Sequence, residues 1–243
     1  MTKVAVIGGT GLNDLGAAAE PLGNLQTPYG PASALPQRLQ FGDQAVLFLA
    51  RHGQPHQIAP HDINYRANLW LLAQFGVRRI LAVNAVGGIA ADLGPGALAV
   101  PDQLIDYTWG RASSFSGPDQ LLHVDFTEPF TPELRHALIA GAAQAGIALT
   151  DGGTYACTQG PRLETAAEIN RLERDGCSLV GMTAMPEAAL ARELGLDYAS
   201  LCLVVNPAAG RGSGPITESS MRAVMAAGMQ QARSVLQEAV RRL

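Results

Sequence analysis

The sequence contains a single lysine, Lys3, and the other sixteen of its seventeen basic residues are arginines. A Walker A phosphate loop and a Schiff-base enzyme both need a lysine in the site, so both classes are excluded unless Lys3 itself serves. The net charge of −4 is the opposite of the basic excess that a nucleic-acid-binding surface requires. We therefore expect no nucleic acid partner.

Cysteines and long apolar stretches are also scarce. The three cysteines, Cys157, Cys177 and Cys202, lack CxxC spacing, which argues against a zinc site or a disulfide framework and favours small buried side chains in a reducing compartment. No apolar run reaches the ~18 residues of a membrane-spanning helix. The segment MTKVAVIGGTG predicts a strand and a turn instead of a signal peptide. These features predict a cytoplasmic protein with no membrane partner and no bound metal.

Short apolar runs rich in Val, Ile and Leu recur along the chain. They predict strands at 4–7, 45–50, 79–83, 97–105, 178–181 and 198–205. Thr, Pro and Gly at the appropriate ends predict helices at 132–146, 186–195 and 217 to about 242. Alternating strands and helices indicate an α/β fold, with a mixed, mostly parallel twisted sheet flanked by helices. Because no repeat or charged linker interrupts the pattern, we predict a single domain over residues 1–243.

The residues that follow the apolar runs are candidates for one site, because ligands of such sheets bind beyond the carboxyl ends of the strands. These residues are Gly8, Gly9, Thr10, Gly11, Arg51, His52, Asn84, Ala85, Met182, Thr183 and Asn206. The set combines glycines, hydroxyls, amides, an arginine and a histidine, without an acidic cluster. It predicts a site for an anion.

Three of these positions suit phosphate, although each also has a structural interpretation. Residues 8–11 predict a tight turn that carries the Thr10 hydroxyl, and Asp14 stands where a dinucleotide-binding GxGxxG would place its third glycine. Arg51 and His52 offer a bidentate fork and a further donor. Thr183 precedes a predicted helix, where its hydroxyl either contacts an anion or caps the helix.

Glu164 and Asn206 indicate a different kind of ligand. Asn206 ends a very apolar run and offers one acceptor and two donors in a plane. Glu164, in TQGPRLETAAE, offers only acceptors when it is ionised. The two residues suit a planar heterocycle better than a metal ion.

Seven segments in this order resemble the trimeric purine nucleoside phosphorylases and, within them, the methylthioadenosine phosphorylase branch. The segments are IGGTGL, RHGQPHQIAPHDINYRAN, NAVGGI, VDFTEPF, GPRLETAAE, GMTAMPEAALARELG and VVNPAAG, and they extend over nearly the whole chain. The resemblance implies one α/β domain in a homotrimer, phosphate as co-substrate, no cofactor, and phosphorolysis of a purine nucleoside or thionucleoside.

The resemblance also implies a role for individual residues. Phosphate would be held by Thr10, Arg51, His52, Asn84, Ala85 through its backbone, and Thr183. Met182 would lie along the ribose, and Leu163 stands where the family has a phenylalanine against the base. His123 would enter the site of a neighbouring subunit. Met221 lies where the branch builds an apolar 5′ pocket, although methionines at helical spacing more often belong to a core.

Two positions indicate the purine. Asn206 and Ala208 stand where the methylthioadenosine branch has two aspartates. As the catalytic residue, Asn206 would accept a hydrogen bond from N7–H of the leaving purine and donate to a 6-carbonyl, while Glu164 would accept from N1–H. We interpret the substrate as S-methyl-5′-thioinosine, cleaved to hypoxanthine and 5-methylthioribose 1-phosphate. Inosine/guanosine phosphorylase, methylthioadenosine phosphorylase and a non-catalytic nucleotide-binding protein remain as alternatives.

Overall fold

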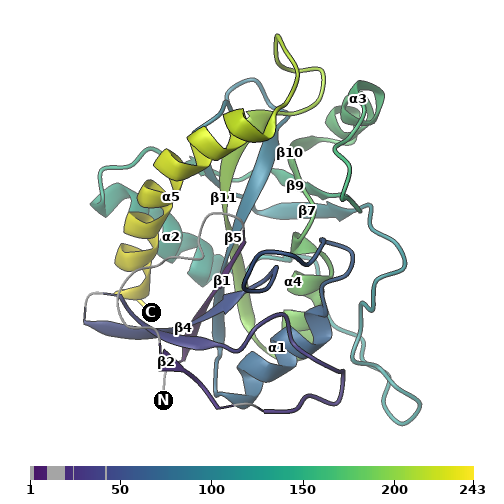
Figure 1. Ribbon diagram of the computed structural model, residues 1–243, viewed down its shortest axis with the longest axis vertical. Helices are drawn as coiled ribbons and strands as arrows, with labels where there is room; N and C mark the ends of the chain where they lie inside the picture. The colour runs from purple at the N-terminus through teal and green to yellow at the C-terminus, as the bar shows by residue number, and fades with distance from the viewer. Residues whose placement is uncertain (1–2, 10–19, 24, 42) are drawn as a thin grey trace.

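The computed structural model describes residues 3–9, 20–23, 25–41 and 43–243 (Figure 1). One mixed sheet runs through it, in the strand order β2 (Glu20–Pro21), β3 (Gln37–Phe41), β4 (Gln44–Ala50), β1 (Val4–Gly8), β5 (Arg79–Gly88), β10 (Cys177–Gly181), β9 (Thr154–Cys157) and β7 (Gln103–Asp106). A branch leaves β5 through β11 (Asp197–Pro207), β6 (Leu98–Val100) and β8 (Thr150–Asp151). Among these strands, β1–β4, β1–β5, β5–β11, β9–β10, β7–β9 and β6–β8 pair in parallel, which confirms the predicted fold class.

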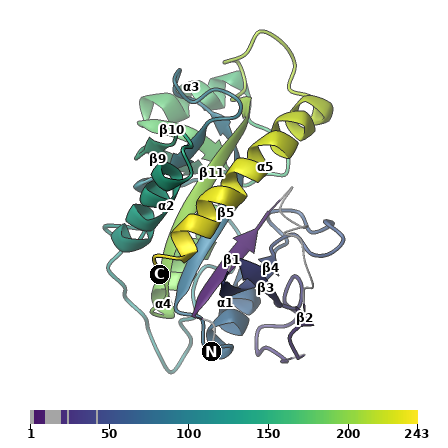
Figure 2. The same cartoon turned by 90° about the vertical axis from the view of Figure 1, so that its left-hand side faces the viewer.

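Helices cover both faces of the sheet (Figure 2). On one face lie α2 (Pro132–Gln144) and α5 (Glu218–Val240), and on the other α1 (Tyr65–Gln74) and α4 (Ala184–Glu193). The helix α3 (Ala166–Arg174) packs near β9 and β10. Successive side chains of a strand point to opposite faces, so Val4 and Val6 pack with α2 and α5, while Ala5 and Ile7 pack on the other side. Burial on both faces explains the uninterrupted apolar runs.

The helix boundaries follow the predicted signals closely. Thr217 caps α5, where its side chain accepts a hydrogen bond from the backbone N–H of Ser220. Met185 has non-helical φ and ψ of −116° and 138°, so the regular part of α4 begins at Pro186, as predicted. None of the helices that the structure describes is long and apolar enough to cross a membrane.

Two predicted strands differ from the structure. The run 97–105 forms two strands, β6 and β7, separated by Pro101 and Asp102, because proline cannot donate to a ladder. The strand predicted at 79–83 continues through the NAVGG segment to Gly88. Asn84 and Ala85 therefore lie inside β5 and not beyond its end.

The segment still presents unpaired backbone, for a different reason. β11 follows β5 from Arg79 to Gly88 along one edge, so β1 and β10 share the other edge. β1 pairs with residues 79–82, and β10 pairs with Gly87 and Gly88. Among the described strands, none pairs with residues 83–86 on that shared edge. A gap in strand pairing, and not a strand end, thus exposes this part of the backbone.

Candidate functional site

A cavity of about 660 Å³ opens at the gap in the pairing of β5. It collects residues that follow β4 and β10, residues inside β5 and β11, and the first turns of α5. Ten predicted site residues line it: Arg51, His52, Asn84, Ala85, Leu163, Glu164, Met182, Thr183, Asn206 and Met221. Segments that are far apart in sequence therefore meet here, although Asn84, Ala85 and Asn206 lie inside their strands and not beyond the ends.

Three of the residues to which the resemblance assigns a place in the site are not part of this lining. Thr10 lies outside the described residues. Ala208 is buried behind the cavity, where its N–H donates to the carbonyl of Gly88 at 2.7 Å. His123 is exposed and lies in the long segment between β7 and α2. Within the described part of the chain, no cluster of three His, Cys, Asp or Glu side chains could hold a metal ion.

Arg51 is buried against a carboxylate that the sequence did not indicate. Its Nε and Nη2 donate to the two oxygens of Glu187 at 2.7 and 2.8 Å, and Nη1 donates to the carbonyl of Val83 at 3.0 Å. Tyr198 also donates its hydroxyl to Glu187, at 2.8 Å. Burial disfavours the guanidinium charge, but Glu187 more than offsets this, so the pKa of Arg51 lies above its ordinary value.

The edge of the Arg51 guanidinium that carries Nε and Nη2 is therefore directed at Glu187. A guanidinium has five N–H groups, and three of them are used here, which leaves one on each terminal nitrogen. These two can each donate a single hydrogen bond toward the cavity. The sequence did not indicate Glu187 as the partner, because it comes from α4 and is 136 residues away.

One ring nitrogen of His52 is engaged by a backbone carbonyl. Its Nδ1 lies 2.8 Å from the carbonyl oxygen of Ile58, which can only accept, so Nδ1 carries the proton. The pKa of His52 is lowered to about 4, mainly by burial; the charges of Arg51 and His56 act in the same direction, and the hydrogen bond to Ile58 opposes them. The neutral ring, stacked on His56 at 4.4 Å between centroids, leaves the Nε2 lone pair available.

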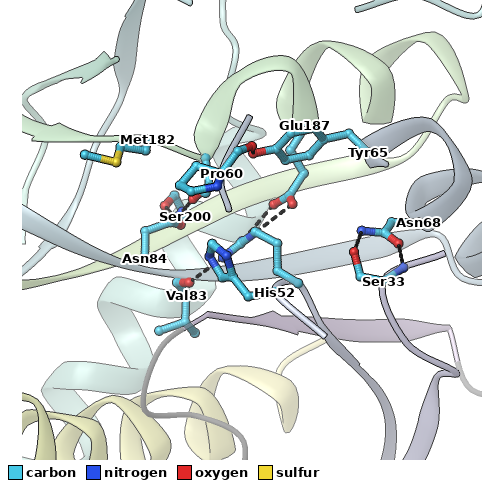
Figure 3. Close-up of polar contacts among 12 residues, drawn as sticks. Ser33, His52, Pro60, Tyr65, Asn68, Val83, Asn84, Met182, Glu187 and Ser200 are labelled. Atoms are coloured by element: carbon cyan, nitrogen blue, oxygen red, sulfur yellow. Dashed lines mark hydrogen bonds and ion pairs between the residues drawn. The ribbon is translucent and has the colours of Figure 1, made fainter. Parts of the chain in front are cut away.

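Asn84 links two hydroxyl groups, and Figure 3 shows it beside the residue that carries one of them, Ser200. Ser200 donates from Oγ to Asn84 Oδ1 at 2.7 Å, and Asn84 Nδ2 donates to Thr183 Oγ1 at 2.7 Å. All three side chains are buried. Thr183 occupies the N-cap position of α4, but its side chain makes no capping hydrogen bond. Of the two interpretations of Thr183, anion contact therefore has the better structural support.

The other end of the cavity carries Glu164 and Asn206. Thr158 donates its hydroxyl to Glu164 Oε1 at 2.7 Å. Asn206 Nδ2 donates to the carbonyl of Pro207 at 2.7 Å, which orients the amide. A Cβ at Gly87 would lie 3.4 Å from Asn206 Nδ2 and 3.1 Å from Val180 Cγ1. Glycine at position 87 thus keeps the space beside the Asn206 amide open.

Arg111 supports the site without belonging to any predicted motif. Its Nη1 donates to the carbonyls of Met182 and Met185 at 2.8 and 2.5 Å, and its Nη2 donates to the carbonyls of Thr158 and Gln159 at 3.3 and 2.9 Å. One guanidinium thereby joins the segment next to Thr183 to the segment that positions Glu164. Nothing in the sequence around Arg111 indicated this role, because the residue lies in a long connection without periodicity.

Comparison with known proteins places these features in a family. A model of the Phosphorylase superfamily matches residues 3–241. The chain is 52% identical to a probable S-methyl-5′-thioinosine phosphorylase from Pseudomonas syringae pv. tomato, over 97% of each chain. It is 44% identical to a 6-oxopurine nucleoside phosphorylase from Pyrococcus furiosus, over 93% of this chain and 87% of that protein.

Solved structures of phosphorylases share the fold of this chain. The fold superposes with a TM-score of 0.91 on a variant of adenosine/methylthioadenosine phosphorylase from Schistosoma mansoni in complex with methylthioadenosine, at 33% identity, covering 99% of this chain and 91% of that one. A methylthioadenosine phosphorylase from an antarctic soil metagenomic library gives a TM-score of 0.92 at 34% identity, covering 99% and 85%.

Proposed function

This chain belongs to the phosphorylase superfamily, and on that premise we propose that it cleaves S-methyl-5′-thioinosine with phosphate. The products are hypoxanthine and 5-methylthioribose 1-phosphate, the reaction needs no cofactor, and residues 1–243 act as one catalytic domain. The observation that carries the choice of base is the Asn206 amide, which Pro207 orients and which shares its cavity with Glu164.

In the proposed complex, phosphate lies where β5 has unpaired backbone. Alternate residues of a strand present their backbone groups to the same edge. Since the carbonyl of Val83 accepts from Arg51, the backbone of Ala85 faces the same gap. The donors to phosphate are then Ala85 N–H, the Thr183 hydroxyl and one N–H from each terminal nitrogen of Arg51. His52 Nε2 accepts from a protonated phosphate oxygen. Asn84 binds phosphate indirectly, through its hydrogen bond to Thr183. Thr10 is the last of the proposed phosphate-binding residues.

The chemistry requires no protein nucleophile. A phosphate oxygen forms a bond to C1′ of the ribose while the bond between C1′ and N9 of the purine breaks, and its electron pair leaves with the base. The departing purine takes up a proton at N7 from solvent, and Asn206 Oδ1 accepts a hydrogen bond from that N7–H. Fixed donors around phosphate supply orientation, and the phosphate charge stabilises the oxocarbenium-like ribose, along which Met182 lies.

The orientation of the Asn206 amide favours a 6-oxopurine. One proton of Nδ2 is held by the carbonyl of Pro207, and the other can donate to O6 of hypoxanthine. Adenine would require an acceptor toward its 6-amino group. Turning the amide over would set Oδ1 against the Pro207 carbonyl, so that two acceptors face each other without a proton. Glu164 adds an acceptor for N1–H, which adenine lacks, and Leu163 covers the base.

The 5′ end of the cavity favours a methylthio group. Met221, Met225 and Ile216 line it from the start of α5, and the Glu218 and Arg222 side chains nearby pair with each other at 2.6 Å. A thioether gains from apolar, polarisable surroundings. The similarity to 6-oxopurine nucleoside phosphorylases keeps inosine and guanosine as the second candidate substrates.

We also propose that the enzyme is a cytoplasmic homotrimer. Trp109 and Leu121 are 73% and 72% exposed in the same long segment that carries His123. A subunit contact over this segment would cover both side chains. In the proposed trimer a neighbouring subunit covers this segment, and His123 reaches that neighbour's cavity. Light scattering coupled to gel filtration tests the mass, and a monomer that is fully active would contradict the assembly.

One assay separates the candidate functions. The protein is incubated with phosphate and, in separate reactions, with S-methyl-5′-thioinosine, methylthioadenosine, inosine or guanosine, and the release of free base is followed. The proposal requires the highest kcat/KM with S-methyl-5′-thioinosine. Fastest release of adenine from methylthioadenosine would overturn the base assignment, and no release from any nucleoside would favour a non-catalytic binding protein.

A further inference from the structure

The side chains of Ser200 and Asn84 meet because of strand register. In the parallel pair of β5 and β11, Asn84 lies opposite Cys202, and Ser200 lies opposite Ala82. Positions 82, 84, 200 and 202 are therefore on one face of the sheet, the face that α4 covers. Thr183, at the start of α4, reaches the same point from the other side of the Asn84 amide.

The donor and acceptor in each contact follow from the chemistry of the groups. Asn84 Nδ2 can only donate, so Thr183 Oγ1 accepts and its own proton must be donated elsewhere. Asn84 Oδ1 can only accept, so Ser200 donates its single hydroxyl proton in that hydrogen bond. The thiol of Cys202, 3.3 Å from Ser200 Oγ, is then the donor in the remaining contact. Burial raises the pKa of Cys202 to about 12, so the thiol keeps its proton.

We propose that Ser200 is a positioning residue, which fixes the orientation of the Asn84 amide and thereby makes the Thr183 hydroxyl an obligatory donor to phosphate. This inference rests on the proposed function, because it assumes that phosphate is the anion in the cavity. Ser200 does not line the cavity and makes no contact with substrate. Its effect on the anion passes through one amide and one hydroxyl.

Loss of the Ser200 hydroxyl removes the reason for this orientation. Asn84 Oδ1 would then be buried without a donor, which costs free energy. Turning the amide over lets Oδ1 accept the Thr183 proton, while Nδ2 turns to the vacated position beside Cys202 Sγ, a weak acceptor. The Thr183 hydroxyl then no longer donates to the anion. Hydrogen bonds to charged groups are stronger than those between neutral groups, so phosphate affinity should fall by about tenfold or more. Binding of the nucleoside involves other residues and should not change.

The test compares Ser200→Ala with the wild-type protein. Calorimetry measures the Kd for inorganic phosphate, and steady-state kinetics measure KM separately for phosphate and for S-methyl-5′-thioinosine. We expect both phosphate constants to rise by about tenfold or more, with less than about a twofold change in the nucleoside KM. An unchanged phosphate Kd, or an equal rise in both KM values, would overturn the inference.

Ser33 provides a matched control. It also forms a hydrogen-bonded pair with a buried asparagine, Asn68, whose Nδ2 donates to Ser33 Oγ at 2.9 Å, away from the cavity lining (Figure 3). Ser33→Ala should leave phosphate and nucleoside constants unchanged. A rise in phosphate Kd as large as that of Ser200→Ala would mean that loss of any such pair weakens the site, and would overturn the specific role of Ser200.

A double-mutant cycle isolates the route through Thr183. In a Thr183→Val background no hydroxyl remains to be oriented, so adding Ser200→Ala should change phosphate Kd by less than about twofold. A full tenfold further loss would contradict the inference. If Ser200→Ala fails to fold, Ser200→Cys, whose thiol is a weaker donor, should show the same selective rise to a smaller extent. Absence of wild-type activity with every nucleoside would refute the proposed function, whereas the phosphate Kd series would still test Ser200.

Discussion

The two oxygens of Glu187 accept from Nε and Nη2 of Arg51 at 2.7 and 2.8 Å, and both side chains are almost completely buried. This pair joins the end of β4 to the first turn of α4, next to Thr183. It holds the guanidinium in place, so that the N–H groups left over have a defined position. Because each of these buried charges is compensated by the other, removal of one should be costly.

Glu187→Gln should therefore lower the free energy of unfolding by about 3 kcal/mol or more, since it leaves a buried guanidinium without its counter-charge. Chemical denaturation of the two proteins at the same pH measures the difference. The control is Glu168→Gln, which breaks an exposed pair with Arg162 and should cost less than about 1 kcal/mol. Equal losses in the two variants would show that the Arg51–Glu187 pair contributes no more than a surface pair.

His52 should titrate far below an ordinary histidine. Burial lowers its pKa to about 4, whereas a histidine in the unfolded chain titrates near 6.5. The native state thus binds fewer protons than the unfolded state at pH 5, and the stability that neutral His52 contributes is present above pH 6.5 and is lost as the pH falls toward 4.

NMR of the ring protons of His52 tests this shift. The signal is assigned by its absence in His52→Gln, and we expect a midpoint near pH 4 in the phosphate-free protein. A midpoint near 6.5 would mean that the ring is solvated and charged at mildly acidic pH. In that case the assignment of Nε2 as an acceptor for protonated phosphate would be wrong.

Asn206→Asp should move the substrate preference toward 6-aminopurines. A carboxyl group can accept from the 6-amino group of adenine, which the amide as oriented by Pro207 cannot do. The ratio of kcat/KM for S-methyl-5′-thioinosine to that for methylthioadenosine should fall by at least about tenfold. An unaltered ratio would show that Asn206 does not contact the 6-position.

Arg111→Lys should weaken both halves of the site. An ammonium group has three donors without the planar fork, so it cannot hold the carbonyls of Met182, Met185 and Gln159 together. We expect kcat/KM to fall by about tenfold or more, with KM rising for phosphate and for nucleoside. Arg174→Lys, on the exposed end of α3, serves as the control and should behave as wild type. An effect of Arg111→Lys on one substrate alone would contradict its linking role.

The sequence predicts most of the central sheet, because strands that are buried on both faces appear in the sequence as continuous apolar runs. It also places the starts of α4 and α5, through Pro186 and Thr217. The extension of β5 was missed because Asn84 interrupts the apolar pattern, although its side chain is buried and satisfied by hydrogen bonds. α1 was missed despite a capping residue, Asn64, whose side chain accepts from the N–H of Ala67.

The sequence likewise predicted one part of the candidate site and not another. Residue type and position were sufficient to gather Arg51, His52, Thr183 and Asn206 in one cavity. The direction of their hydrogen bonds was not predictable, because it depends on partners brought together only by the fold. Glu187 accepts hydrogen bonds from one edge of the Arg51 guanidinium. The carbonyl of Ile58 accepts from Nδ1 of His52, which leaves Nε2 of the neutral ring as an acceptor.

The most direct test is a crystal structure of the protein with hypoxanthine and phosphate bound. We predict that Asn206 Nδ2 donates to O6, that Asn206 Oδ1 accepts from N7–H, and that Glu164 accepts from N1–H. Phosphate should accept from the Thr183 hydroxyl at the gap between β1 and β10. A purine bound away from both Asn206 and Glu164 would contradict the proposed recognition of the keto base.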